Sequence, residues 1–261
     1  KMRFYLFHAP YAVCTNSFPH FFRFAMPETT PESFETARFE RVIQDKTVVA
    51  QCDSRLNEQA EWLLKTIETV LTDNNESLKD GWTLELGFSV LALIERDGGY
   101  VVCEPDFDDD PFESVVEDVS RSLWTLVMQS EVSALAGVAE LQNSPRFDET
   151  IVLRKGCLQE DAVFLQRDEP SNEDAASQNG MDIQDSGWYI GGLDDDDEGS
   201  EDDNDYEAIY AYQLLDSRPM LVSALALPTG YVAVFEGDEI TAVYDEEENL
   251  VWGMGDEDDE E

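Results

Sequence analysis

The chain has 261 residues, of which 42% are hydrophobic and 11% aromatic, which suits one large folded domain or two ordinary ones and excludes a wholly disordered chain. Its 59 acidic and 16 basic residues give a net charge of −43. This charge argues against nucleic acid and anionic membranes as natural ligands, because both would be repelled.

The acidic residues are concentrated in the second half of the chain. Residues 151–261 hold 32 acidic and four basic side chains, a net charge of −28, whereas residues 1–150 have a net charge of −15. Such asymmetry favours a basic protein as partner, whose association it can accelerate by about 10- to 1000-fold. The alternative is an acidic surface that serves only solubility, but clustering of the acids favours a partner.

The first half of the chain predicts an α+β domain over residues 1–145. Strands are expected over residues 2–8, 48–52, 82–94 and 100–103, with a turn at Asp97-Gly98-Gly99. A helix is expected after the cap Asp53-Ser54, because apolar residues from Leu56 to Leu71 recur at helical spacing. A second helical region is expected over residues 112–138.

The second half predicts a further α+β domain over residues 150–261. Strands are expected over 150–153, 162–165, 188–190, 231–235, 242–244 and 250–252, with a polar loop over 170–184. Residues 206–215 suit a short helix or turn, 220–225 suit a helix, and the acidic tail over 255–261 is expected to be disordered. The predicted fold is therefore α+β in two domains, each a mainly antiparallel sheet with packed helices.

Few residues suit catalysis or a cofactor. The two histidines, His8 and His20, stand outside any metal or triad motif, and no phosphate-binding loop or nucleophile motif occurs. The four cysteines are widely spaced, which is typical of free thiols in a reducing cytoplasm, and no apolar run reaches the roughly 18 residues of a membrane span. We expect a cytoplasmic protein that is not an enzyme, binds no cofactor or metal and inserts into no membrane, although a hydrolase based on carboxylates alone is an alternative.

The segment 185–206 dominates the acidic half. It begins as Asp185-Ser186-Gly187-Trp188-Tyr189 and then becomes almost entirely acidic. Carboxylates at this density must be solvated, bind cations or face a basic surface, because their burial without partners costs several kcal/mol each. We expect partner contacts from the aromatic and acidic residues of this segment: Asp185, Trp188, Tyr189, Asp194, Asp195, Asp196, Asp197, Glu201, Asp202, Asp203 and Tyr206.

Calcium binding is the alternative for this acidic run. Asp194, Asp196, Glu198, Gly199 and Asp205 fall at positions 1, 3, 5, 6 and 12 of an EF-hand loop, where position 6 is the turn glycine and the others are ligand positions. The position that normally holds a bidentate glutamate is Asp205, and no amphipathic helix flanks the loop. A run that is nearly all acidic matches such a pattern by chance, so a partner surface is preferred. For Trp188, a buried position in a strand is an equally good interpretation as a position in an interface.

An ordered set of motifs resembles a bacterial family of immunity proteins over about residues 150–240. The set runs Arg167-Asp168-Glu169-Pro170, Asp185-Ser186-Gly187-Trp188, Ile209-Tyr210, Leu225, Pro228, Gly230 and Phe235-Glu236. It is similar to that family's pattern of an R-E-x-P segment, a D-S-G-W segment, an acidic loop and an I-Y-D-like segment. Here residues 171–184 widen the gap before Asp185, and Ile190-Gly191-Gly192-Leu193 replaces the usual aromatic-S-G-D step.

The resemblance implies a protein that binds and neutralises a toxin rather than one that performs chemistry. An additional domain fused to such a domain resembles the immunity proteins of type VI secretion effectors, particularly those paired with a DNase toxin. A nuclease must present a cationic cleft to phosphates, and clustered carboxylates are complementary to such a cleft. The expected partner is therefore a cognate toxin with a basic surface, a nuclease in the first instance.

Overall fold

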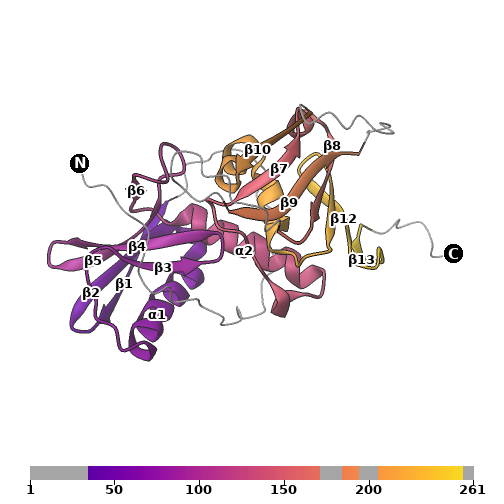
Figure 1. Cartoon of the computed structure of the whole chain (residues 1–261). Helices are drawn as coiled ribbons and strands as arrows, with labels where there is room; N and C mark the ends of the chain where they lie inside the picture. Colours follow the sequence, from indigo (N-terminus) through magenta and orange to yellow (C-terminus); the bar gives the residue numbers. More distant parts are fainter. Residues whose placement is uncertain (1–34, 171–183, 194–204, 255–261) are drawn as a thin grey trace. The chain divides into compact units, whose positions relative to one another are not determined.

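The computed structural model describes residues 35–170, 184–193 and 205–254 (Figure 1). The chain divides into one unit up to Val127 and a second from Met128, and the division falls inside the helix α2 (Ser120–Leu135). The expected strand over 2–8 and the acidic tail over 255–261 lie outside the described residues. The predicted α+β class is confirmed, because each unit contains a mixed, mostly antiparallel sheet with packed helices.

The N-terminal unit is a sheet with the order β1-β2-β5-β4-β3, with β6 paired to β5. All pairs are antiparallel except β2 and β5. The elements are β1 (Thr36–Ile43), β2 (Lys46–Asp53), η1 (Ser54–Leu56), α1 (Asn57–Asp73), β3 (Trp82–Leu86), β4 (Ser89–Arg96), β5 (Gly99–Pro105), β6 (Val115–Val116) and the start of α2.

The helix predicted from the apolar spacing is confirmed as α1. Its buried stripe includes Leu63, Ile67 and Leu71, and it lies against one face of the sheet (Figure 1). That face supplies buried residues from β2, β3, β4 and β5, so helix and sheet enclose one hydrophobic core. Residues at successive positions of a strand point to opposite faces, and a smaller cluster that includes Val49 and Ile94 covers the second face.

Two expectations for this unit were wrong in extent. The segment 82–94 is not one strand but the hairpin β3–β4, whose turn contains Gly87 at φ +57°, a conformation that favours glycine. The second helix begins at Ser120 rather than near residue 112. It starts there because the Asp118 carboxylate accepts a hydrogen bond from the Ser120 amide (3.0 Å), which caps the first turn.

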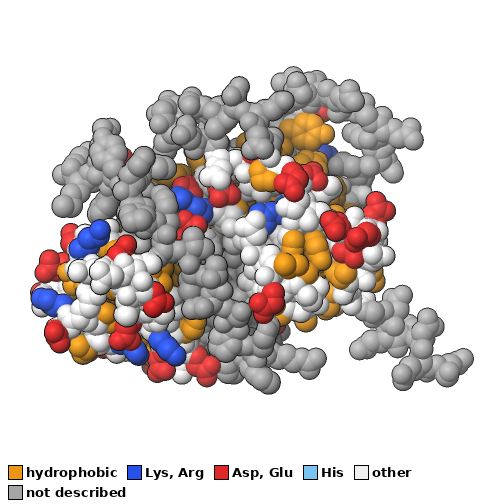
Figure 2. Space-filling view, turned by 60° about the horizontal axis from the view of Figure 1, so that its bottom comes forward, with side chains coloured by type: hydrophobic (Ala, Val, Ile, Leu, Met, Phe, Trp, Pro, Cys, Tyr) orange, Lys and Arg blue, Asp and Glu red, His pale blue; other side chains and the backbone are white. Residues whose placement is uncertain are grey.

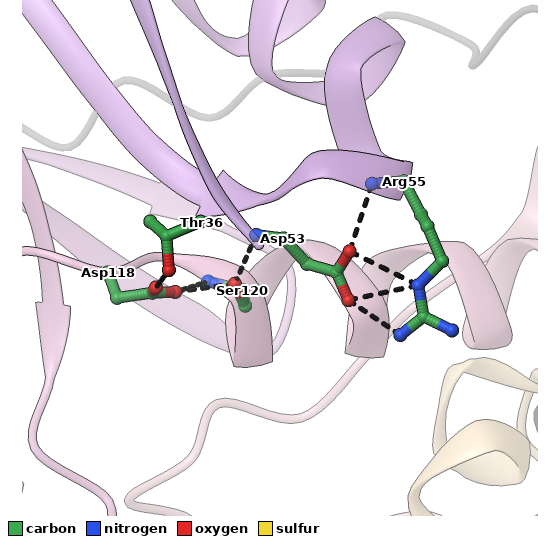
Figure 3. A network of polar contacts seen from close by, with 5 residues as sticks. All are labelled: Thr36, Asp53, Arg55, Asp118 and Ser120. Atoms are coloured by element: carbon green, nitrogen blue, oxygen red, sulfur yellow. Dashed lines mark hydrogen bonds and ion pairs between the residues drawn. The ribbon is translucent and has the colours of Figure 1, made fainter. Parts of the chain in front are cut away.

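A polar network joins the strand ends to this helix start (Figure 3). The Ser120 hydroxyl donates to Asp118 and accepts a hydrogen bond from the Asp53 amide at 2.7 Å, while the Thr36 hydroxyl lies 3.5 Å from Asp118. Arg55 donates hydrogen bonds from Nε to both carboxylate oxygens of Asp53 and from Nη2 to one of them. Burial opposes the ionised form, but the hydrogen bonds from Arg55 prevail and lower the pKa of Asp53. Each carboxylate therefore has a structural partner.

The C-terminal unit is a seven-stranded sheet with the order β10-β7-β9-β8-β11-β12-β13. Only β7 and β9 are parallel. The elements are the end of α2, η2 (Ala139–Leu141), β7 (Thr150–Arg154), η3 (Cys157–Gln159), β8 (Ala162–Arg167), β9 (Asp185–Gly192), β10 (Tyr206–Tyr210), η5 (Ala211–Gln213), α3 (Leu214–Ser217), η6 (Pro219–Ala226), β11 (Val232–Glu236), β12 (Glu239–Tyr244) and β13 (Leu250–Gly253).

The two faces of this sheet differ in burial. The inner face carries buried apolar residues at alternate positions: Ile151, Leu153, Val163, Leu165, Trp188, Ile190, Ala233 and Phe235. The 3₁₀ helix η6 lies against this face, since the Trp188 indole donates a hydrogen bond to the Leu225 carbonyl at 3.1 Å. The opposite positions form the outer face, which is half-buried or exposed. The expected helix or turn over 206–215 was partly wrong, because Tyr206–Tyr210 pairs with β7 as strand β10.

Candidate partner-binding surface

The D-S-G-W motif is the first half of β9, and its tryptophan is a core residue. Trp188 is 1% exposed and lies on the inner face. The guanidinium carbon of Arg167 lies 5.6 Å from the centre of the indole ring, and the indole N–H is satisfied by Leu225. Such a side chain reaches a partner only if β9 leaves the sheet. Trp188 therefore positions β9 and does not belong to the surface that we propose below.

Arg167 begins the first segment of the motif set, Arg167-Asp168-Glu169-Pro170, and has a structural role. Its side chain is 4% exposed, and its Nη1 donates hydrogen bonds to the carbonyls of Asn143 and Leu227, the latter at 2.8 Å. Burial lowers the pKa of Arg167, an effect that the nearby Glu149 carboxylate opposes. The buried cation joins β8 to two connecting segments, so this arginine stabilises the sheet.

Gly187 shows why the motif requires glycine before the tryptophan. Its φ is +76°, and a Cβ atom at this position would lie 2.2 Å from the carbonyl oxygen of Asp168. The same close approach forms a hydrogen bond of 2.8 Å from the Asp168 amide to the Gly187 carbonyl. The Asp185 carboxylate accepts a hydrogen bond of 2.9 Å from the Gly187 amide, which holds the turn-like conformation.

Strand alternation directs the neighbour of Trp188 to the outer face. Tyr189 contacts Phe164 of β8 with 5.7 Å between ring centres, and it contacts Tyr206 of β10 with 6.1 Å between ring centres. We call these three residues the aromatic row. Tyr206 is 43% exposed, and Val152 of the same face is 37% exposed. The row therefore presents apolar and aromatic area that no described element covers entirely.

Two glycines at the end of β9 make room for this arrangement. A Cβ at Gly191 would lie 2.6 Å from the Phe164 ring, so the absence of a side chain lets the ring approach the strand backbone closely. A Cβ at Gly192 would collide with the Glu160 carboxylate, which is ion-paired with Arg154. The Gly191-Gly192 pair thus admits an aromatic ring and an ion pair directly over the backbone.

One end of the sheet gathers acidic side chains, and we call it the acidic end. β9 ends here at Gly192, β10 begins here, and the β11–β12 turn lies here because Glu236 pairs with Ala162 and Glu239. Its described acidic residues are Glu160, Asp161, Asp205, Glu207, Glu236, Asp238 and Glu239. The cations at this end are Arg154, which is paired with Glu160, the exposed Lys155, and Arg218, which is buried and donates to the carbonyls of Glu160, Asp161 and Gly237. Negative charge therefore prevails at this end.

The predicted contact residues are only partly brought together. Tyr189 and Tyr206 meet in the aromatic row, whereas Asp185 lies at the other end of β9, four residues from Tyr189. Seven predicted residues lie outside the described part of the chain: Asp194, Asp195, Asp196, Asp197, Glu201, Asp202 and Asp203. The residues that border this segment, Leu193 and Asp205, both lie at the acidic end, where the Leu193 amide binds the Ala162 carbonyl and the Asp205 carbonyl accepts from Lys155. Phe164 was missed by the sequence analysis, and only the strand register reveals it.

Figure 2 shows how charge and apolar surface adjoin on one face of the molecule. Hydrophobic side chains form patches on the described surface, and Asp and Glu side chains lie beside them, with several Lys and Arg side chains among them toward the left of the view. Within the described ranges, no group of three or more histidine, cysteine or acidic side chains is placed to hold a metal ion. No helix there is long and apolar enough to cross a membrane. The segment of the EF-hand-like match, apart from Asp205, is outside these ranges.

The strongest pKa perturbation of an acid in the N-terminal unit has a structural origin. Burial raises the pKa of Glu104 to about 7, although hydrogen bonds from the Ser122 side chain and amide favour its ionised form. The hydrogen bond from the Ser122 amide to the Glu104 carboxylate is 2.7 Å long and caps the first turn of α2. The Ser122 hydroxyl is also hydrogen-bonded to the Ser89 hydroxyl, with 2.8 Å between the two oxygens. This buried group stabilises a helix end.

Comparison with known proteins identifies the second unit. Residues 128–246 match the family model of the Imm33-like domain. This segment is therefore similar to an immunity-protein domain. The match begins at Met128, the first residue of the second unit, and it includes the Arg167–Trp188 contact and the whole aromatic row. A search of curated proteins and a search of solved structures return no match. The Imm33-like domain indicates a role in neutralising a toxin.

Proposed function

We propose that this protein binds a cognate antibacterial toxin in the cytoplasm and neutralises it by covering its active site, without performing chemistry of its own. The observation that carries the proposal is the Imm33-like domain over residues 128–246. The acidic end of its sheet adds a physical reason for partner choice, because charge complementarity speeds association and disfavours partners of like charge. Speed matters because a toxin must be intercepted before it acts.

We further propose that the toxin is a nuclease of the DNase type delivered by a type VI secretion system. A nuclease holds phosphates in a cationic cleft, and the net charge of −43 on this chain is complementary to such a cleft. The acidic run 194–203 belongs to the proposed contact, together with Asp185, Tyr189 and Tyr206. Its borders at the acidic end support this, because they connect the run to the described carboxylates there.

Partner capture tests the proposal at two salt concentrations. The full chain is used to capture proteins from the source cell's lysate at low and at moderate salt, and the captured protein is assayed for DNA cleavage with and without the chain. A basic nuclease that is silenced supports the full proposal. A captured toxin without nuclease activity would retain the immunity role and reject the nuclease, and the absence of a partner at either salt would reject both.

Charge reversal tests where the interface lies. Replacing Asp194, Asp195 and Asp196 by lysine should slow association with the captured toxin and flatten its dependence on salt. The matched control replaces Glu246, Glu247 and Glu248, which are exposed in the β12–β13 turn at the opposite end of the sheet. Both variants change the net charge equally. Equal slowing in both would show that only the overall charge matters, and the acidic run would lose its place in the interface.

A further inference from the structure

The aromatic row combines features that a purely structural cluster does not need. Phe164, Tyr189 and Tyr206 come from three different strands, and their ring planes are tilted by 59° and 56° to one another. They lie on the outer face, whereas the core of this unit is formed by the opposite face. The row continues apolar surface toward Val152 and, beyond the end of β9, toward Leu193, which is 45% exposed.

The surroundings of the row determine which partner chemistry fits. Tyr206 pairs directly with Arg154, and that cation is held by Glu160. Asp205 precedes Tyr206 and is exposed, and Gln166 beside Tyr189 donates to the Asp168 carboxylate at 3.1 Å. The row thus has aromatic faces with carboxylates at its borders. Aromatic faces attract cations, and arginine in particular stacks on such rings while it pairs with a nearby carboxylate.

Two other occupants fit less well. A second copy of this chain would bring another net charge of −43 against an already acidic end, which opposes self-association. Nucleic acid bases could stack on the rings, but the phosphates would face the same carboxylates. A protein surface that carries positive charge is the occupant favoured by both the rings and their borders.

We infer that the aromatic row is the anchor of the toxin interface and receives arginine side chains of the toxin. The inference rests on the proposed function and specifies the chemistry of its interface. Tyrosine and arginine dominate the energetics of protein interfaces, because they combine large buried area with directed polar contacts. The acidic end would then attract the toxin, and the row would retain it through short-range contacts.

The first test measures the solvent access of individual side chains in the complex. Hydroxyl-radical footprinting is carried out on the full chain, free and bound to the toxin that it neutralises. Oxidation of Tyr189 and Tyr206 should fall about fivefold or more on binding, whereas Met254, which is 59% exposed near β13, should react equally in both states. Equal oxidation of the two tyrosines in both states would overturn the inference.

Ring substitutions then separate aromatic from apolar contact. Tyr206→Phe keeps the ring and should keep affinity for the same toxin within about threefold, Tyr206→Leu should lose about tenfold, and Tyr206→Lys should lose about a hundredfold or more. Leu250→Lys, at a residue of 59% exposure on β13, is the control for an added cation and should lose much less. If Leu and Phe variants bind equally, no cation contacts the ring. If wild-type protein neutralises the toxin and all variants bind equally, the inference fails while the proposed function stands; if wild-type protein neutralises no toxin, both fail.

Discussion

Replacing Trp188 by phenylalanine should lower the stability of the C-terminal unit without weakening its contact with a partner. The indole N–H donates to the Leu225 carbonyl, and both residues are buried. The phenylalanine ring cannot donate, so the carbonyl loses its partner at a cost of about 1–3 kcal/mol. The smaller ring leaves a cavity that adds about 1–2 kcal/mol. We expect a total of about 3 kcal/mol.

Thermal unfolding followed by near-UV circular dichroism measures this loss. At about 3–5 °C per kcal/mol for a unit of this size, the melting transition of the C-terminal unit should fall by roughly 10 °C. Trp252→Phe is the matched control, because Trp252 is half-buried on β13 and should shift the transition by far less. An unchanged transition, together with a large loss of affinity for the toxin at 15 °C, would refute the reasoning and place Trp188 at the interface.

Three further predictions concern conformational strain, pH dependence and thiol reactivity. Gly187→Ala should destabilise the C-terminal unit by more than about 3 kcal/mol in urea unfolding, because the new Cβ would lie 2.2 Å from the Asp168 carbonyl oxygen. The control Gly156→Ala, at φ +88° with open space around the new Cβ, should cost only about 1–2 kcal/mol. Equal costs for the two variants would contradict the steric argument. The pKa of Glu104 is raised in the folded state to about 7 from 4.5, so its ionisation makes stability fall as pH rises from about 4.5 to 7, by at most about 3 kcal/mol; Glu104→Gln should remove this part of the slope, and identical slopes would contradict it. In a variant with Cys14 replaced by serine, the remaining cysteines are Cys52, Cys103 and Cys157, whose pKa values burial raises to about 12, 12 and 11. Reaction of these thiols with a thiol reagent should be slow at pH 8 in the folded protein and complete only in denaturant, and fast reaction would show that they are accessible.

Local patterns in the sequence were sufficient to predict a helix or strand where one of its faces is buried and the other is exposed. The spacing from Leu56 to Leu71 predicted α1 because a helix with a single apolar stripe has a distinct period. The segment 82–94 was predicted as one strand because Gly87 is followed directly by the apolar Phe88, so the hydrophobic run hides the turn. β10 was obscured in a similar way, since its residues are mostly exposed on an edge strand and show no clear alternation.

The site shows a different limit of sequence reasoning. Adjacent residues of a strand point to opposite faces, so the pair Trp188-Tyr189 had to place one ring inside and one outside, but the sequence does not say which. The aromatic row depends on the register between β8, β9 and β10, which joins residues 164, 189 and 206. Register is determined by long-range packing and not by local pattern, which is why Phe164 could not be found beforehand.

Titration of the toxin's activity tests the central claim most directly. The captured toxin is held at a fixed concentration well above the expected Kd, and its activity, DNA cleavage in the first instance, is measured as the full-length chain is added. The account predicts that toxin activity falls linearly to zero at a fixed molar ratio of chain to toxin. The chain should remain chemically unchanged, and toxin activity should return when the toxin is released at high salt. Activity that persists at a large excess of the chain, or a chain that inactivates many toxin molecules each, would contradict neutralisation by stoichiometric binding.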